Sequence, residues 1–143
     1  GEFGHMVIHP GGRRCYCGKN GCLDAYCAAW VLQGSQEAKL EDFFEALDSG
    51  DSKNQIKWQD YLENLAIAVS NIRMALDCRI VMGGYIGSFL EKHMDTFLEY
   101  IRRYDYFDAD ISYLSTGKYM RLASVVGVAQ MVVHRYLDEL YTA

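Results

Sequence analysis

The sequence predicts an α/β domain in which helices flank a short sheet. Two observations predict it. Apolar residues recur at steps of three and four in long segments, which is typical of helices that bury one face. The order strand, helix, strand, helix over residues 79–140 is typical of a parallel sheet layer. The chain has 143 residues, 50% of them hydrophobic and 23% charged, so residues 1–143 can bury a core as a single domain.

The first part of the chain is predicted to begin as a strand and to continue with helices. Alternation of side chains indicates that residues 4–9 are the end of a strand, which the Pro-Gly-Gly run at 10–12 stops. A loop rich in Cys and Gly then leads to Cys22. Apolar density without Gly or Pro predicts a helix over 23–32, and a second short helix is expected over 40–47.

The clearest helical pattern covers residues 55–76. Its apolar residues fall on one stripe, formed by Leu62, Leu65, Ala66, Val69, Ile72 and Leu76. The β-branched run at 79–82 follows it and stops at Gly83 and Gly84, which predicts a short buried strand that ends in a glycine turn.

The last part of the chain repeats this order. Residues 88–103 are predicted to form a helix with Ser88 as its N-cap, and residues 109–115 are predicted to form the next strand. A final helix is expected over 122–140. Its inner side is expected to consist of Val125, Val126, Ala129, Val133, Leu137 and Leu140.

Composition argues against several classes of protein. The net charge is −5 and the isoelectric point is about 5.3, so we expect no direct nucleic-acid contact by this chain, because phosphate contacts need clustered Lys and Arg. No apolar stretch approaches the roughly 20 residues that cross a bilayer. No secretory leader opens the sequence, and we therefore expect a cytoplasmic protein without a membrane segment.

The most informative segment holds Cys15, Cys17 and Cys22, three of the five cysteines. Three thiolates and one imidazole form a closed tetrahedral zinc site of the structural type. Spacing leaves the fourth ligand open between His5 and His9, which would share one face of the predicted strand. The alternative is a cluster of buried thiols without a metal. The two other cysteines, Cys27 and Cys78, are interpreted as core residues on helical faces.

A closed zinc site has no open position for water, so the metal is expected to stiffen the loop rather than to catalyse. The stiffened loop would fix its flanking carboxylates, Glu2 and Asp24, as acceptors for a hydroxyl-rich ligand such as a monosaccharide. The alternative is that each carboxylate is a solvated surface charge.

Two elements of the sequence carry a resemblance to a known family. The first is Gly1-Glu2-Phe3-Gly4-His5, and the second runs from Cys15-Tyr16-Cys17-Gly18 to Gly21-Cys22-Leu23-Asp24. Together they resemble the signature of the ROK family, named for repressors, open reading frames and kinases. The run Ile80-Val81-Met82-Gly83-Gly84 resembles the family's strand and glycine turn near the nucleotide site.

The resemblance implies the C-terminal lobe of the actin-like, ribonuclease-H-like sugar kinase fold, with the zinc-stapled loop near its N-terminus. It implies that His5, Cys15, Cys17 and Cys22 are the zinc ligands. It further implies that Glu2, His5 and Asp24 contact a monosaccharide or a sugar derivative, and that Gly83 and Gly84 border a nucleotide such as ATP.

Two departures from the family pattern favour its regulator branch. Asp24 stands where the family usually has Glu, and Tyr85 follows the glycine turn where the kinases usually continue with a small residue. The first hypothesis is therefore the sugar-binding lobe of a transcriptional regulator of carbohydrate metabolism, with DNA contacted through an N-terminal domain that this chain lacks. The resemblance also implies a homodimer.

The alternative function is the C-terminal half of an ATP-dependent hexose or N-acylhexosamine kinase. The phosphate loop and catalytic Asp of such kinases lie upstream of the zinc motif in the family, and this sequence contains neither. We therefore expect that the chain by itself is not an enzyme. A third interpretation is a zinc-stapled scaffold whose ligand site has decayed.

Overall fold

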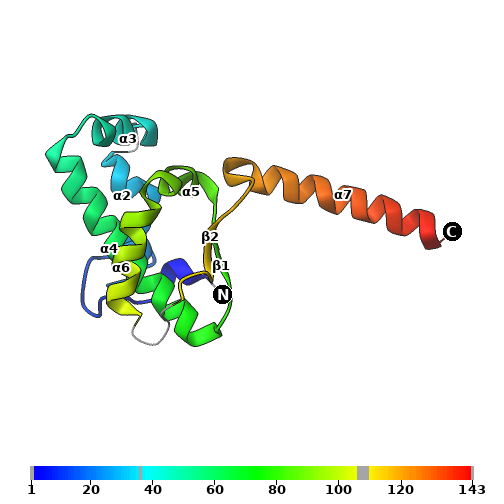
Figure 1. Cartoon of the computed structure of the whole chain (residues 1–143), viewed down its shortest axis with the longest axis horizontal. Helices are drawn as coiled ribbons and strands as arrows, with labels where there is room; N and C mark the ends of the chain where they lie inside the picture. The colour runs from blue at the N-terminus through cyan, green and yellow to red at the C-terminus, as the bar shows by residue number, and fades with distance from the viewer. Residues whose placement is uncertain (1, 36, 106–109, 143) are drawn as a thin grey trace.

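The computed structural model describes residues 2–35, 37–105 and 110–142. Most of its regular structure is helical, and a two-stranded sheet lies at one side of the helices (Figure 1). In chain order the elements are η1 (Phe3–His5), α1 (Asp24–Cys27), α2 (Ala29–Gln33), α3 (Leu40–Asp48), α4 (Ser52–Leu76), β1 (Ile80–Met82), α5 (Gly84–Leu90), η2 (Glu91–His93), α6 (Met94–Tyr104), β2 (Leu114–Thr116), η3 (Met120–Leu122) and α7 (Ala123–Thr142).

Helix α4 is the centre of the core, as its apolar stripe predicts. It begins at the N-cap Asp51, whose carboxylate accepts a hydrogen bond from the backbone N–H of Asn54 at 2.8 Å. The stripe packs in the core as far as Val69, next to α6, where Phe97 and Ile101 are fully buried, whereas Leu76 at its predicted end is 55% exposed. Leu62 is also fully buried. Burial of side chains of this size stabilises the fold by about 1.5–3 kcal/mol each, so the α4–α6 contact contributes substantially to the stability of the core.

The predicted parallel strand pair is confirmed, although both strands are short and β1 is not buried as predicted, since Val81 is 63% exposed. β1 and β2 pair in parallel, with Ile80 opposite Leu114 and Met82 opposite Thr116. The second strand starts later than predicted, and residue 109 of that prediction lies outside the described residues.

The predicted helix start at Ser88 is wrong. Helix α5 begins at Gly84, and the Ser88 hydroxyl donates to the Tyr85 carbonyl at 2.7 Å from inside this helix. The short 3₁₀ turn η2 separates α5 from α6.

The predicted strand over 4–9 is also wrong. The backbone N–H of Met6 donates to the Phe3 carbonyl at 2.9 Å, which closes the 3₁₀ turn η1. The following residues make only an isolated bridge between Val7 and Cys22. These side chains therefore do not alternate across a sheet.

The helix predicted over 23–32 is present as two pieces that break at Ala28, where the backbone is extended. The Tyr61 hydroxyl donates to the Cys27 carbonyl at 2.8 Å. A side chain of α4 thus supplies a hydrogen bond to this carbonyl where the helix is interrupted.

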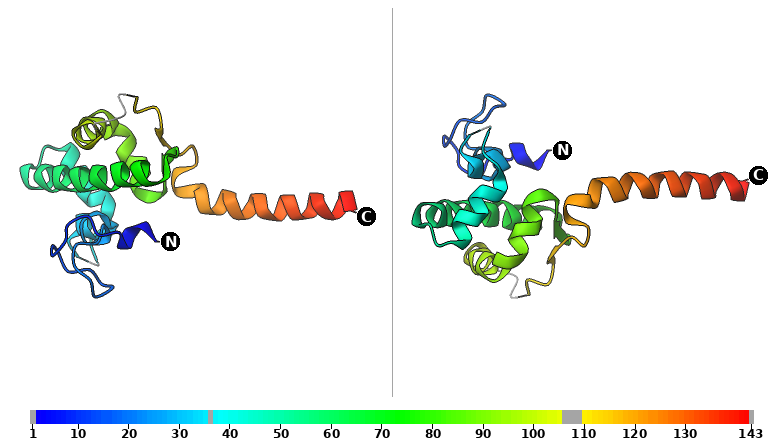
Figure 2. Two further views of the ribbon diagram at one scale, coloured as in Figure 1. Left: turned by 90° about the horizontal axis from the view of Figure 1, so that it is seen from below. Right: turned by 90° about the horizontal axis from the view of Figure 1, so that it is seen from above.

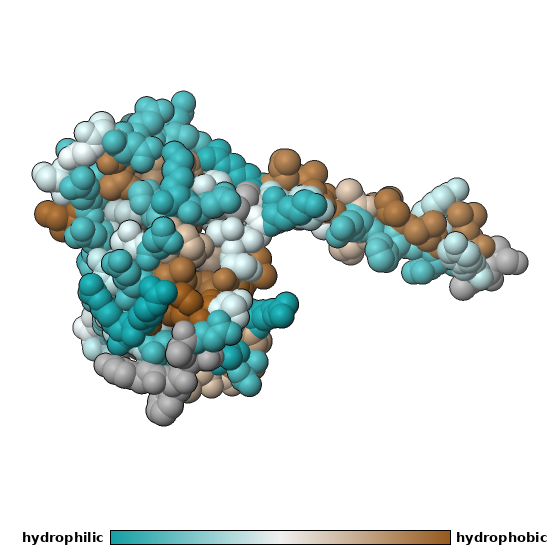
Figure 3. All heavy atoms as spheres, viewed as in Figure 1, coloured by the Kyte–Doolittle hydropathy of each residue, from teal (hydrophilic) through white to brown (hydrophobic). Residues whose placement is uncertain are grey.

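Helix α7 forms as predicted, but its apolar side does not face inward. It extends away from the body in all three ribbon views (Figures 1 and 2). Val125, Val133, Leu137 and Leu140 are all exposed. Figure 3 shows hydrophobic atoms along this helix. No helix in the described part of the chain is long and apolar enough to span a membrane.

Candidate functional site

The cysteine loop is held in shape by backbone hydrogen bonds. The N–H of Cys15 donates to the Lys19 carbonyl at 2.8 Å, and the N–H of Gly18 donates to the Cys15 carbonyl at 3.0 Å. Further along, the Ile8 N–H donates to the Gly21 carbonyl at 2.8 Å. Gly21 has a φ of +83°, and a Cβ atom there would collide with the His9 backbone, so only glycine fits this crossing of two chain segments.

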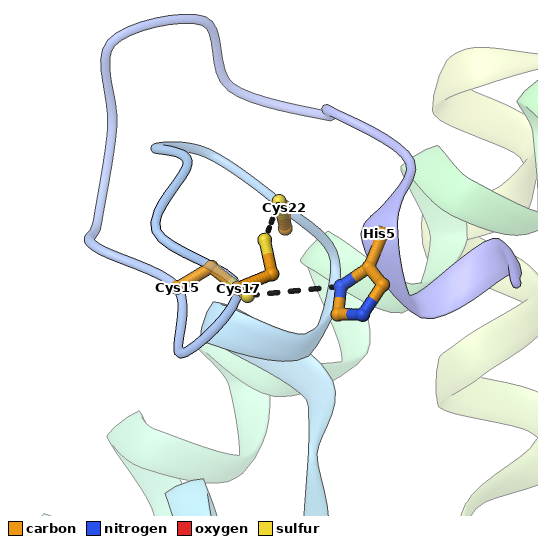
Figure 4. Close-up of side chains that lie close together, drawn as sticks. All are labelled: His5, Cys15, Cys17 and Cys22. Carbon is orange, nitrogen blue, oxygen red and sulfur yellow. Dashed lines mark hydrogen bonds between the residues drawn. The ribbon is translucent and has the colours of Figure 1, made fainter.

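The structure brings all four predicted ligands together (Figure 4). The ligand atoms of His5, Cys15, Cys17 and Cys22 all lie within 4.8 Å of one another. The distance from Cys15 Sγ to His5 Nδ1 is 3.8 Å, and that from Cys17 Sγ to Cys22 Sγ is 3.7 Å.

These distances fit a tetrahedral zinc ion. Two sulfur ligands at about 2.3 Å from such an ion are about 3.8 Å apart, and a sulfur and a nitrogen ligand are about 3.6 Å apart. The donor set, three thiols and one imidazole nitrogen, is also the closed structural type. The residues therefore fit zinc, which would be held by His5 Nδ1 and the three sulfurs and would fix the loop.

His9, the other candidate for the fourth ligand, has a different partner. Its Nε2 lies 2.6 Å from Asn64 Oδ1, and Asn64 is buried on α4. The Asn64 amide in turn donates to the Asp60 carbonyl at 2.6 Å. His9 is therefore an anchor between the loop and α4, and the choice between the two histidines falls on His5.

The two cysteines outside the cluster are only partly as predicted. Cys27 ends α1 and packs against the core, and burial raises the pKa of its thiol. Cys78 lies between α4 and β1 rather than on a helix.

The surroundings of two cluster thiols give them different acidities. A hydrogen bond from the Lys19 backbone lowers the pKa of Cys17, whereas burial raises the pKa of Cys22 to about 11. Zinc binds the thiolate form, so occupation of the site displaces these protons.

Beside the metal ligands, the structure places the three predicted sugar-contacting residues in one group. His5 turns its Nδ1 toward the thiols and its Nε2 toward Glu2, whose Oε2 is 3.4 Å away. The Asp24 carboxylate lies directly over Gly4, where any Cβ atom would overlap it. Glu2 thus lies beside the outer nitrogen of His5, and Asp24 lies against the same turn at Gly4. Metal binding at Nδ1 would leave the proton on Nε2.

Tyr16 also belongs to this group, although the sequence interpretation did not select it. Its hydroxyl donates to Asp24 Oδ2 at 2.9 Å and lies 3.3 Å from His5 Nε2. The hydrogen bond to Asp24 raises the pKa of Tyr16 to about 12, so the phenol keeps its proton at neutral pH. Its position between Cys15 and Cys17 was the signal that could have identified it, because both neighbours are fixed by the cluster.

The predicted nucleotide-contacting residues lie elsewhere in the fold, on the turn from β1 to α5. Gly84 has a φ of +69°, and a Cβ atom added at Gly83 would meet no atom within 4 Å. The Tyr85 ring lies under the Arg121 guanidinium at 3.7 Å and near Phe89 at 5.9 Å. Tyr85 is the residue that the sequence interpretation took as a departure from the kinase pattern.

Comparison with known proteins identifies the family. The ROK family model matches residues 1–135. The chain belongs to the ROK family. Among its relatives are N-acetyl-D-glucosamine kinases from Salmonella arizonae and Shigella flexneri. Each is 30% identical over 106 residues, an alignment that covers 62% of this chain and 35% of the relative.

Solved ROK structures confirm the predicted actin-like kinase fold. A ROK hexokinase from Thermus thermophilus is similar with a TM-score of 0.69 and 28% identity, over 81% of this chain and 41% of that one. A ROK glucokinase from Streptomyces griseus, solved with glucose and AMPPNP, has a TM-score of 0.76 at 19% identity over 91% of this chain and 50% of that one. This second likeness concerns the fold alone.

The comparisons correct one expectation from the sequence. We expected a chain that is not an enzyme because it lacks the phosphate loop and the catalytic Asp. The relatives are ROK sugar kinases, and the chain spans about a third of the length of the curated ones. Both features were expected upstream of the zinc motif, so their absence from a part of this length says nothing about the activity of the whole protein.

Proposed function

We propose that this ROK chain is the sugar-orienting lobe of an ATP-dependent kinase that acts on a hexose or an N-acylhexosamine. The names of its relatives, N-acetyl-D-glucosamine kinase and hexokinase, support this class of reaction. The observation that carries the proposal is the arrangement around His5, which faces the thiol cluster with one ring nitrogen and Glu2 with the other.

In this proposal the loop binds and orients the sugar. The carboxylates of Glu2 and Asp24 accept hydrogen bonds from sugar hydroxyls, and the Nε2–H of His5 donates one. Zinc, when bound, holds the loop in place and takes no part in the chemistry. Fixed acceptors in fixed directions align the reacting hydroxyl with the phosphoryl group, which is the main contribution that a protein makes to phosphoryl transfer.

The turn at Gly83 and Gly84 would border the nucleotide. The open space beside Gly83 lets a ligand approach the backbone closely. The contacts of Tyr85 with Arg121 and Phe89 hold its ring along α5 and η3, so this residue is compatible with the kinase.

The free thiols and the use of ATP suit a reducing compartment, and we propose a cytoplasmic location and a homodimer.

The test is ATP-dependent phosphorylation by the protein as its gene encodes it, with glucose and N-acetylglucosamine as substrates. We expect ADP release that depends on one of these sugars. Glu2→Gln should raise the KM for the sugar about tenfold, since it weakens a hydrogen bond from the sugar to a charged acceptor. The control is Glu99→Gln on the exposed side of α6, which should leave KM unchanged.

Binding of a sugar without any phosphoryl transfer would contradict the kinase proposal. It would favour the regulator, in which the same residues would hold an effector and shift a conformational equilibrium. Absence of binding for any sugar would favour the scaffold whose ligand site has decayed.

A further inference from the structure

The hydroxyl of Tyr16 stands between two of the residues that we propose as sugar contacts. It donates to Asp24 Oδ2 at 2.9 Å and lies 3.3 Å from His5 Nε2. When zinc is held at Nδ1, which faces the cluster thiols, His5 carries its proton at Nε2, and the Tyr16 oxygen can accept it. One hydroxyl group thus links an N–H donor to a carboxylate acceptor.

A sugar hydroxyl bound at the same place would have the same pattern. It would donate to Asp24 and accept from His5, because a hydroxyl carries one proton and two lone pairs. The Tyr16 hydroxyl and a sugar hydroxyl therefore compete for one pair of partners.

Tyr16 is free to leave this position. Its residue is 72% exposed, and its ring touches His5 edge-on at a centroid distance of 5.1 Å. Its backbone neighbours, Cys15 and Cys17, belong to the cluster, so rotation of the side chain alone moves the hydroxyl away. Such a rotation in an exposed residue takes place in picoseconds to nanoseconds.

We infer that Tyr16 is a specificity-determining residue whose hydroxyl occupies one sugar-hydroxyl position in the free protein and is displaced when the sugar binds. This inference rests on the proposed function and names a new participant in the same site. Its consequence is quantitative. When the Tyr16 hydroxyl holds this position in a given fraction of the free molecules, the apparent association constant for the sugar falls by that fraction. A ligand without a hydroxyl at that position would displace Tyr16 without replacing the contacts of its hydroxyl with His5 and Asp24.

The experiment compares the wild-type protein with Tyr16→Phe, which keeps the ring and removes the competing hydroxyl. Sugar affinity is measured by calorimetry with glucose and N-acetylglucosamine, and KM and kcat by ADP release, on the protein as its gene encodes it. We expect Tyr16→Phe to bind the sugar about three- to tenfold more tightly and to lower KM by the same factor, with kcat within about twofold and Tm unchanged. Tyr136→Phe on α7, where the side chain is exposed, is the matched control and should change nothing.

Weaker binding by Tyr16→Phe would overturn the inference, because it would make the hydroxyl a direct contact or a support for Asp24. Unchanged affinity would also overturn it. If the wild type and both variants bind neither sugar, the proposed function fails and the inference fails with it. Sugar binding with unimproved Tyr16→Phe affinity removes only the inference.

Discussion

The cysteine loop at the start of the chain and helix α7 at its end differ in how they are supported. The loop has almost no regular secondary structure, yet Cys15 and Cys22 are only 2% and 0% exposed. Helix α7 is regular over 20 residues, yet Met131 and Tyr141 are 73% and 87% exposed. The comparison shows that periodicity in a sequence predicts a helix but does not say whether the rest of the chain covers its apolar side.

Loss of a proposed zinc ligand should have the largest effect on the loop. Cys22→Ser is expected to release the metal and to lower the stability by about 3 kcal/mol or more, roughly 10 °C in Tm, because a structural zinc site contributes directly to folding. Elemental analysis and calorimetry measure both effects. Cys78→Ser is the control, since Cys78 lies outside the cluster. A Cys22→Ser protein with a full zinc complement would contradict the assignment.

The histidine anchor should have a smaller effect of a different kind. His9→Ala leaves the buried Oδ1 of Asn64 without its partner, which costs about 1–3 kcal/mol, but it should leave the zinc content unchanged. His5→Ala should lose zinc. Equal zinc content in the two variants would contradict the choice of His5, rather than His9, as the fourth zinc ligand.

The comparison predicts that α7 tolerates changes that the body does not. Val132 is 65% exposed on α7, and Val132→Asp should change the stability by no more than about 0.5 kcal/mol. The same change at Val69, which is 3% exposed on α4, should unfold the protein, because it buries an unpaired charge. Strong destabilisation by Val132→Asp would mean that α7 is covered in solution.

The smallest expected effect is a pH dependence in the body. Burial lowers the pKa of His93, which contacts the Trp58 ring edge-on at 5.3 Å. The folded state therefore binds fewer protons than the unfolded state below about pH 6.5, and stability falls as the pH falls through that value. His93→Gln should flatten the slope of Tm between about pH 7 and 5. An unchanged slope would remove His93 as the cause.

Much of the core could be predicted from the sequence because burial follows periodicity. The stripe through Leu62 and Val69 does line the core, and the pair of strands at Ile80 and Leu114 is parallel as expected. The start of the chain could not be predicted in this way. Alternation of side chains indicates a strand over residues 4–9, but hydrogen bonds to residues near Cys22 decide their path.

For the site, the metal cluster was predictable from residue type and spacing, apart from the choice of histidine. That choice depends on Asn64, which is far away in sequence and close only in the fold. The role of Tyr16 depends likewise on side-chain positions around His5 and Asp24. The spacing of residues along the chain indicates what kind of site a loop can form. The contacts of the loop with other elements decide which of the candidate residues belong to that site.

The measurement that tests the account most directly is X-ray absorption at the zinc edge, made on the purified protein with and without N-acetylglucosamine. The account predicts one zinc with three sulfurs at about 2.3 Å and one nitrogen at about 2.0–2.1 Å, unchanged by the sugar because the metal only supports the loop. A shell that contains oxygen, or one that gains a ligand when the sugar is added, would contradict it.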